Sequence, residues 1–154
     1  MNEVIGEIIS LMGSEAGRHP ISIHTDLTPE LPHVMADRVQ LQQVLMNLVR
    51  NGIDAIDEAD IAGDLTIRSQ RSGVDQLLIS IRDTGIGLPP EQADKVFDSF
   101  FTTKPQGTGM GLSICWSIIE SHGGRLWATG NPDRGTTFQF TLPVERATTA
   151  MLGA

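Results

Sequence analysis

The stretch DRVQLQQVLMNLVRNGIDAIDE (37–58), followed by DLTIRSQRSGVDQLLISIRD (64–83), decides the fold. The first segment carries apolar residues at helical spacing, and Asp37 with Gln40 three residues later is typical of a helix N-cap. The second segment reads as two strands, and Ser72-Gly73 between them predicts a hairpin. A long helix before an antiparallel strand pair predicts helices layered on a sheet.

The flanking sequence adds elements of both kinds. We expect helices at 4–12, 90–96 (short) and 109–121, strands at 21–27, 125–130 and 136–142, and a short strand or lead-in at 33–37. Because the strands come largely in hairpins, the sequence predicts an α/β two-layer sandwich. Its sheet is mixed and mostly antiparallel, with helices packed on one face. Residues 1–143 form one domain, and 144–154 are expected to be a flexible tail.

Composition excludes several classes of function. The 154 residues are 40% hydrophobic with a net charge of -8, which disfavours a general nucleic-acid binder. A single cysteine, Cys115, excludes an internal disulfide. The sequence has no run of about 18 apolar residues, and its N-terminus lacks the basic start of a signal peptide. We therefore expect a cytoplasmic domain without membrane contact.

The long helix carries two faces. Asn47, Asn51, Asp54 and Glu58 form a polar stripe, and neutral amide oxygens of this kind suit Mg²⁺. The alternative is a solvated polar face. The apolar face comprises Leu41, Val44, Leu45, Leu48, Gly52, Ala55 and Ile56.

The DTGIG segment (83–87) closes an apolar strand. Asp83 there is expected to be partly buried, so its carboxylate needs hydrogen bonds, which an adenine amine would supply. Gly85 and Gly87 would let the backbone turn and approach a flat ring. An ordinary Asp-Gly turn is the alternative.

Two further segments follow in the loop. GTGMGL (107–112) precedes a helix, where exposed backbone N–H groups form a natural phosphate cradle, unless the glycines are only a hinge. VFDSFFTTK (96–104) would anchor a flap whose Lys104 reaches a phosphate, or form a small satellite core.

Together the four segments resemble the ATP-binding catalytic domain of a bacterial sensor histidine kinase, with the Bergerat fold. NLVRNGIDA resembles the N box, DTGIG the G1 box, FDSFFTTK the F box and GTGMGLS the G2 box. The resemblance covers residues 1–143 and is greatest to the nitrogen- and oxygen-sensing branch.

The resemblance implies a role for each matching position. Asp83 would bind the adenine amine, Asn51 would coordinate Mg²⁺, and Asn47 would support the phosphate end. Thr136 or Thr137 would line the adenine site through water, whereas Asp54 stands where many relatives have a basic residue. The implied catalytic residues are Asn47, Asn51 and Lys104, and the implied ATP-binding residues are Asn47, Asn51, Asp83, Gly85, Gly87, Lys104, Gly107, Thr108, Gly109, Gly111, Leu112 and Thr136.

One position bears on the reaction. Hydrolysing relatives and anti-sigma-factor serine kinases carry a glutamate base where this chain has Asn47, and a neutral amide cannot accept a proton near pH 7. A neutral imidazole needs no such base. Asn47 therefore favours transfer from ATP to histidine over hydrolysis. The alternatives are a standalone ATPase or serine kinase on the same fold, or a nonenzymatic nucleotide-sensing module.

The phosphate acceptor is expected elsewhere. None of His19, His24, His33 and His122 resembles the acceptor motif, so each is expected to be structural. The implied partners are a histidine-containing dimerisation domain of the same kinase, preceding residue 1, and indirectly a response regulator. The isolated domain is expected to be a monomer, and a membrane anchor in the parent protein stays open.

Overall fold

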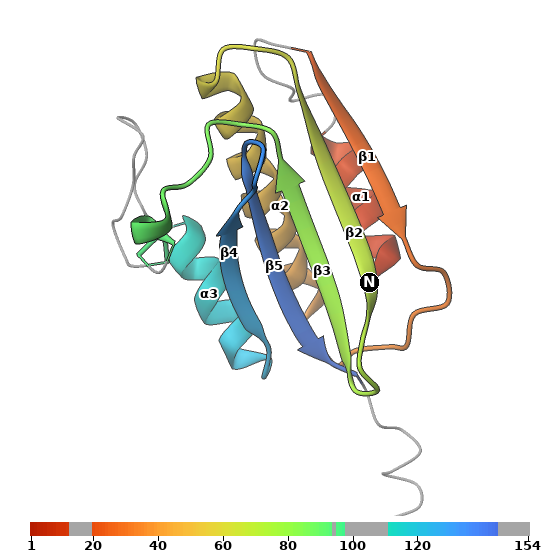
Figure 1. The fold of residues 1–154 in the computed structure, drawn as a ribbon. Helices are drawn as coiled ribbons and strands as arrows, with labels where there is room; N and C mark the ends of the chain where they lie inside the picture. The colour runs from red at the N-terminus through yellow and green to blue at the C-terminus, as the bar shows by residue number, and fades with distance from the viewer. Residues whose placement is uncertain (13–19, 94, 98–110, 145–154) are drawn as a thin grey trace, which may run out of the picture.

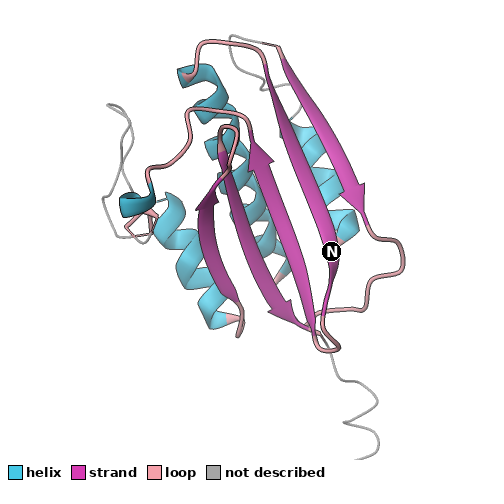
Figure 2. Ribbon diagram, in the orientation of Figure 1, coloured by secondary structure: helices cyan, strands magenta, loops and turns pink. Residues whose placement is uncertain are grey.

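In the computed structural model, three helices lie on one face of a five-stranded sheet (Figures 1 and 2). The structure describes residues 1–12, 20–93, 95–97 and 111–144. The predicted two-layer sandwich is confirmed, whereas the predicted tail lies almost entirely outside the described residues. The elements are α1 (Asn2–Met12), β1 (Ile21–Leu27), α2 (Arg38–Glu58), β2 (Gly63–Ser72), β3 (Gln76–Asp83), the 3-10 helix η2 (Pro90–Gln92), α3 (Gly111–Ser121), β4 (Arg125–Gly130) and β5 (Thr136–Pro143).

The sheet has the strand order β1-β2-β3-β5-β4. Three neighbouring pairs are antiparallel, and β1 with β2 is parallel. Parallel neighbours need a long connection. The connection from β1 to β2 contains α2, which lies on the covered face of the sheet (Figure 1). The expected short strand near 33–37 is a single bridge between Val34 and Val144.

Helix α2 is the longest helix on the covered face. Its N-cap is Asp37, whose side chain accepts a hydrogen bond from Gln40 N at 3.1 Å, as the sequence predicted. The predicted apolar face is buried apart from Ala55, which is half-buried. Val49 and Ile53, which were not part of the predicted apolar face, are also buried. The buried face of α2 is therefore wider than the sequence pattern predicted.

The other face of the sheet is open and polar. One row of paired positions crosses all five strands at Trp127, Gln139, Ser80, Arg68 and Asp26. Gln139 accepts from Trp127 Nε1 at 3.0 Å and donates to Ser80 Oγ at 3.2 Å, and Arg68 Nε donates to Asp26 Oδ2 at 3.1 Å. Among the described residues, no helix is long and apolar enough to cross a membrane.

Candidate functional site

The centre of the candidate site is Asp83, the last residue of β3. Its side chain is 1% exposed, and Oδ1 accepts hydrogen bonds from Gly85 N at 2.8 Å and Thr136 N at 3.2 Å. Desolvation raises the pKa of this carboxyl group above its usual value, and the two backbone hydrogen bonds oppose that rise. Both of these hydrogen bonds end on Oδ1, whereas Oδ2 lies on the side of Gly52, where an added Cβ would be 3.8 Å away.

Helix α2 packs next to this carboxylate through Gly52. Gly52, which follows Asn51, faces β3: a Cβ added there would lie 3.5 Å from the Asp83 Cβ and 2.5 Å from Leu65 Cδ1. A larger residue at this position would require the buried Leu65 side chain to move. Asn51 is itself half-buried, one residue from the contact with Asp83.

The same helix reaches the start of α3. The Asn47 side-chain amide donates to the carbonyl oxygen of Gly111 over 3.5 Å, a long hydrogen bond. The structure therefore places Asn47 next to Gly111, the first residue of α3, where the glycine-rich segment ends. Leu112 is half-buried and packs against the core.

The two glycines after Asp83 serve the protein's own packing. A Cβ on Gly85 would lie 2.4 Å from the carbonyl carbon of Ala55, and Ile86 N donates to Ala55 O at 3.1 Å. Gly87 has φ +84°, a conformation that side chains disfavour. The sequence predicted that glycines here would let the backbone approach a flat ring. In the structure, the close approach at Gly85 is to Ala55 of α2.

The sequence predicted a hairpin of β4 and β5 that turns around 131–133, but not the contact of this turn with Asp83. Asn131 Nδ2 donates to the carbonyl oxygens of Asp83 and Arg134, both at 3.1 Å. Gly135 has φ +88°, and a Cβ there would lie 1.9 Å from the Asp83 carbonyl oxygen. The sequence showed Asn131 only as a turn residue, although a glycine directly before a strand is a signal for close backbone approach.

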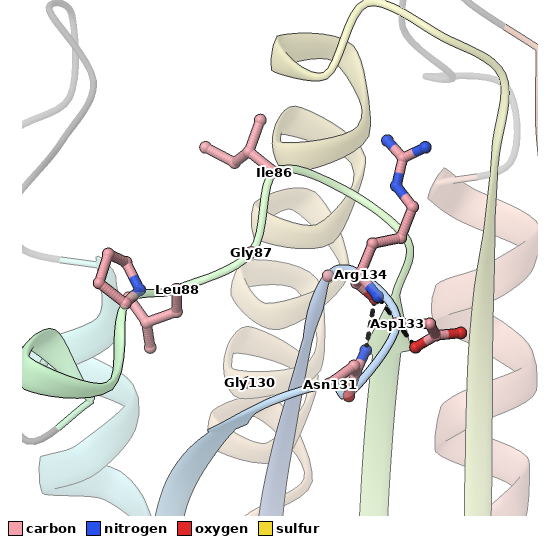
Figure 3. A pocket seen from close by; sticks show the side chains of 9 residues that line it. Ile86, Gly87, Leu88, Gly130, Asn131, Asp133 and Arg134 are labelled. Carbon is pink, nitrogen blue, oxygen red and sulfur yellow. Dashed lines mark hydrogen bonds between the residues drawn. The ribbon is translucent and has the colours of Figure 1, made fainter.

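A cavity of about 350 Å³ adjoins this turn (Figure 3). The segment 86–89 forms one wall and the segment 130–135 the other, and Arg82 is paired with Asp133 nearby at 3.0 Å. Of the predicted site residues that the structure describes, only Gly87 lines it, so this cavity borders the candidate site without containing its carboxylate. The lining residues are Ile86, Gly87, Leu88, Pro89, Gly130, Asn131, Asp133, Arg134 and Gly135.

The remaining predicted residues lie partly within the described part of the chain and partly outside it. Thr136 is buried and contributes its backbone N–H to Asp83, whereas the Thr137 hydroxyl donates to Asn131 Oδ1 at 2.6 Å. In the Phe-rich segment, the Phe97 ring meets Phe138 edge-on at 6.1 Å, which is a core contact. Lys104, Gly107, Thr108 and Gly109 lie outside the described residues.

The titratable groups of the described part form no metal cluster. Within residues 1–12, 20–93, 95–97 and 111–144, no three His, Cys, Asp or Glu side chains are grouped so that they could hold a metal ion. The polar groups that the described residues supply around the candidate site are the Asp83 carboxylate with its two backbone N–H groups, and on α2 the amide side chains of Asn47 and Asn51. Such a set can accept from an amine and offer neutral oxygen to a hard cation.

Comparison with known sequences identifies related proteins. Residues 36–146 match the family described as "Histidine kinase-, DNA gyrase B-, and HSP90-like ATPase". The sensor protein TdiS of Thauera aromatica is 39% identical over 94% of this chain and 27% of its own length. The sensor protein FixL of Bradyrhizobium diazoefficiens is 40% identical over 93% of this chain and 28% of its own length. The chain thus spans about a quarter of these relatives.

Solved structures give the same result. The nucleotide-free catalytic domain of the histidine kinase ThkA superposes with a TM-score of 0.82 at 37% identity, covering 94% of this chain and 92% of that one. ThkA in complex with the response regulator TrrA gives 0.78 at 34% identity, over 94% and 40% of the two chains. Full-length ShkA in complex with AMPPNP gives 0.82 at 26% identity, over 94% and 30%.

Proposed function

Because this chain belongs to the family of histidine kinase-, DNA gyrase B- and HSP90-like ATPases, we propose that it binds Mg-ATP and donates the γ-phosphoryl group to a histidine on a separate dimerisation domain. Its fold is that of histidine kinase catalytic domains. The observation that carries the proposal is the buried Asp83 carboxylate, with one oxygen held by two backbone N–H groups. ShkA, a structural neighbour, was solved with the ATP analogue AMPPNP.

Asp83 would select adenine. Two backbone N–H groups fix Oδ1, so the orientation of the carboxylate does not depend on a ligand. The exocyclic amine of adenine would donate a charge-assisted hydrogen bond to this group. Guanine carries an acceptor at the corresponding ring position, so it would face the carboxylate with like polarity.

The phosphates would lie toward α2 and the start of α3. Asn51 would offer an amide oxygen to Mg²⁺, which commonly takes only one or two protein ligands besides phosphates and water. When bound, the ion would neutralise phosphate charge. Asn47, already next to Gly111, would support the phosphate end. Lys104 and the glycine-rich residues Gly107, Thr108 and Gly109 would complete the phosphate cradle.

The residue at position 47 favours a histidine acceptor. Water or a serine hydroxyl needs a general base, and the amide of Asn47 cannot take up a proton near neutral pH. A neutral imidazole attacks with its own lone pair, so the protein needs mainly to position and neutralise the transferring group. A standalone ATPase or serine kinase is therefore the less favoured alternative.

The wider partners follow from the relatives. ThkA was solved in complex with the response regulator TrrA. We accordingly propose that the phosphoryl group passes from the acceptor histidine to a response regulator in the full signalling system. Because the chain spans only about a quarter of its curated relatives, the sensing part and the acceptor are assigned to other segments of such a protein.

A labelling assay tests the proposal. The chain is incubated with radiolabelled Mg-ATP, with and without a separately purified helical domain that carries an acceptor histidine. We expect no label on the chain itself and a phosphoramidate on the added domain that is labile in acid and stable in alkali. Asn51→Ala should reduce transfer at least about tenfold, the scale of one strong polar contact, whereas Gln43→Ala on the exposed side of α2 should not.

Two outcomes would contradict the proposal. Acid-stable labelling of the chain alone would indicate a serine or threonine kinase. Rapid phosphate release without any acceptor would indicate an ATPase. Such an enzyme would need a general base other than Asn47.

A further inference from the structure

The turn between β4 and β5 is fastened to the main chain of Asp83. The register between β3 and β5 runs to the pair Arg82 and Thr137 and stops there. Beyond that pair, Thr136 N donates to the Asp83 side chain at 3.2 Å, and the Asp83 carbonyl oxygen takes its hydrogen bond from Asn131 Nδ2 at 3.1 Å. Where the pairing of β3 with β5 ends, the Asn131 side-chain amide thus takes the place of a backbone donor to the Asp83 carbonyl oxygen. Asp83 is the residue whose carboxylate is proposed to bind adenine.

All the hydrogen-bonding groups of the Asn131 amide are used in this turn. Its two N–H groups reach the carbonyl oxygens of Asp83 and Arg134, and its Oδ1 accepts from the Thr137 hydroxyl at 2.6 Å. Its backbone N–H also donates to Gly135 O at 3.0 Å. Only an amide in this orientation offers two donors toward carbonyls and one acceptor toward a hydroxyl, so the residue is specified by its partners.

Close packing leaves the turn little freedom. Gly135 adopts φ +88°, and a Cβ on it would lie 1.9 Å from the Asp83 carbonyl oxygen. Gly87, on the other wall, would place a Cβ 3.6 Å from Gly135 N. The turn therefore lies close to both the main chain of Asp83 and the loop that follows it.

We infer that Asn131 is a positioning residue for adenine recognition: it holds the Asp83 main chain and the Thr136 N–H in register, so that the carboxylate keeps its aim. The inference rests on the proposed function, in which Asp83 reads the adenine amine. Asn131 acts through Asp83 and needs no contact with nucleotide. A purely structural role would lower stability without changing which purine is preferred.

The test compares two nucleotides in Asn131 variants. Dissociation constants are measured by calorimetry for ATP and for purine riboside triphosphate, which lacks the 6-amino group. The dissociation constant for purine riboside triphosphate divided by that for ATP reports amine recognition, and an effect common to both nucleotides cancels in it. Asn131→Asp keeps the shape but turns both donors into acceptors, so this ratio should fall about five- to tenfold, part of the value of a hydrogen bond to a charged group.

Matched variants separate the possible results. Thr137→Val removes the hydroxyl that orients Asn131 and should lower the ratio less, in the same direction. Gln139→Ala, on the same strand, also removes two side-chain hydrogen bonds but far from Asp83, and should leave the ratio unchanged. An unchanged ratio in folded Asn131→Asp and in Thr137→Val, with a lowered ratio in Asp83→Asn, would overturn the inference alone. An unchanged ratio in Asp83→Asn would overturn the adenine role itself.

Discussion

At the scale of the residue, Asp83 combines a poor position for stability with a good one for recognition. A carboxylate that is 1% exposed loses hydration, and two backbone N–H groups replace only part of it. The raised pKa of Asp83 expresses this cost: ionisation is less favourable in the folded chain than in the unfolded one. The same desolvation strengthens any hydrogen bond that a bound amine donates to it.

Asp83→Asn should separate these two effects. The amide keeps the size and an acceptor for Gly85 N and Thr136 N, but it removes the buried charge and presents a donor to the adenine amine. We expect a loss of about 1.5–3 kcal/mol in ATP affinity, the scale of a hydrogen bond to a charged group. We also expect a higher melting temperature without nucleotide at pH 7. Calorimetric titration with ATP and GTP, and thermal unfolding, measure the two effects.

The pH dependence supplies the control. The cost of ionising Asp83 is fully present above its raised folded pKa and disappears as the pH falls below the usual value of 3.8. The extra stability of the variant should therefore shrink as the pH is lowered from 7 toward 4. A stability difference that is constant across this range, or equal ATP and GTP affinities in the unchanged chain, would show that Asp83 does not have this role.

At the scale of the element, one histidine joins the two helices that flank the site. His122 Nδ1 lies 2.7 Å from the Ile118 carbonyl oxygen, which can only accept, so Nδ1 carries the hydrogen. Nε2 is then the acceptor for Asp37 N at 3.1 Å, which links the end of α3 to the N-cap of α2. The sequence expected His122 to be structural, and these hydrogen bonds agree with that expectation.

Replacing this histidine should loosen the helix pair. His122→Ala removes the acceptor for Asp37 N and should lower the free energy of unfolding by about 1 kcal/mol, a typical value for one hydrogen bond. Urea denaturation measures the change. His24→Ala is the matched control, because His24 is exposed and meets only Asp64 on the surface, at 3.1 Å. Equal effects of the two substitutions would argue against a structural link through His122.

The sequence predicted most elements because local signals and packing agree in them. The Asp37 cap, the Ser72-Gly73 turn and the alternation in β3 each correspond to what the structure shows. Contacts between distant segments gave no local signal: the fit of Gly85 against Ala55, and the hydrogen bond from Asn131 to Asp83, depend on how α2 and the β4–β5 turn dock. Asp83 itself was predictable, because a carboxylate that ends an apolar strand demands partners.

At the scale of the whole molecule, the two faces of the sheet have different partners. The covered face holds the core and the candidate site, whereas the open face carries the polar row from Trp127 to Asp26. The relatives are about four times as long as this chain, and under the proposed function an acceptor histidine elsewhere in such a protein would share one polypeptide with this domain. A shared chain raises their effective concentration.

Tethering should therefore increase transfer. Fusion of the acceptor-histidine domain to this chain through a flexible linker should label faster than the two parts at about 1 micromolar, by up to about three orders of magnitude, because short linkers give millimolar effective concentrations. Initial labelling rates at several dilutions measure this. The rate per molecule should be independent of dilution in the fusion and fall in the mixture. A fusion that shows the same dilution dependence as the mixture would indicate transfer only between molecules.

The attachment of the β4–β5 turn to Asp83 also sets an order of events during synthesis. Asp83 leaves the ribosome 48 residues before Asn131 and 53 residues before Thr136, which complete its surroundings. The strand β3 must therefore wait for β5, its antiparallel neighbour, before the centre of the sheet closes. A nascent chain that still lacks this last strand has not completed the surroundings of Asp83, so under the proposed function a nucleotide could act as a folding ligand only when translation of the domain is nearly complete.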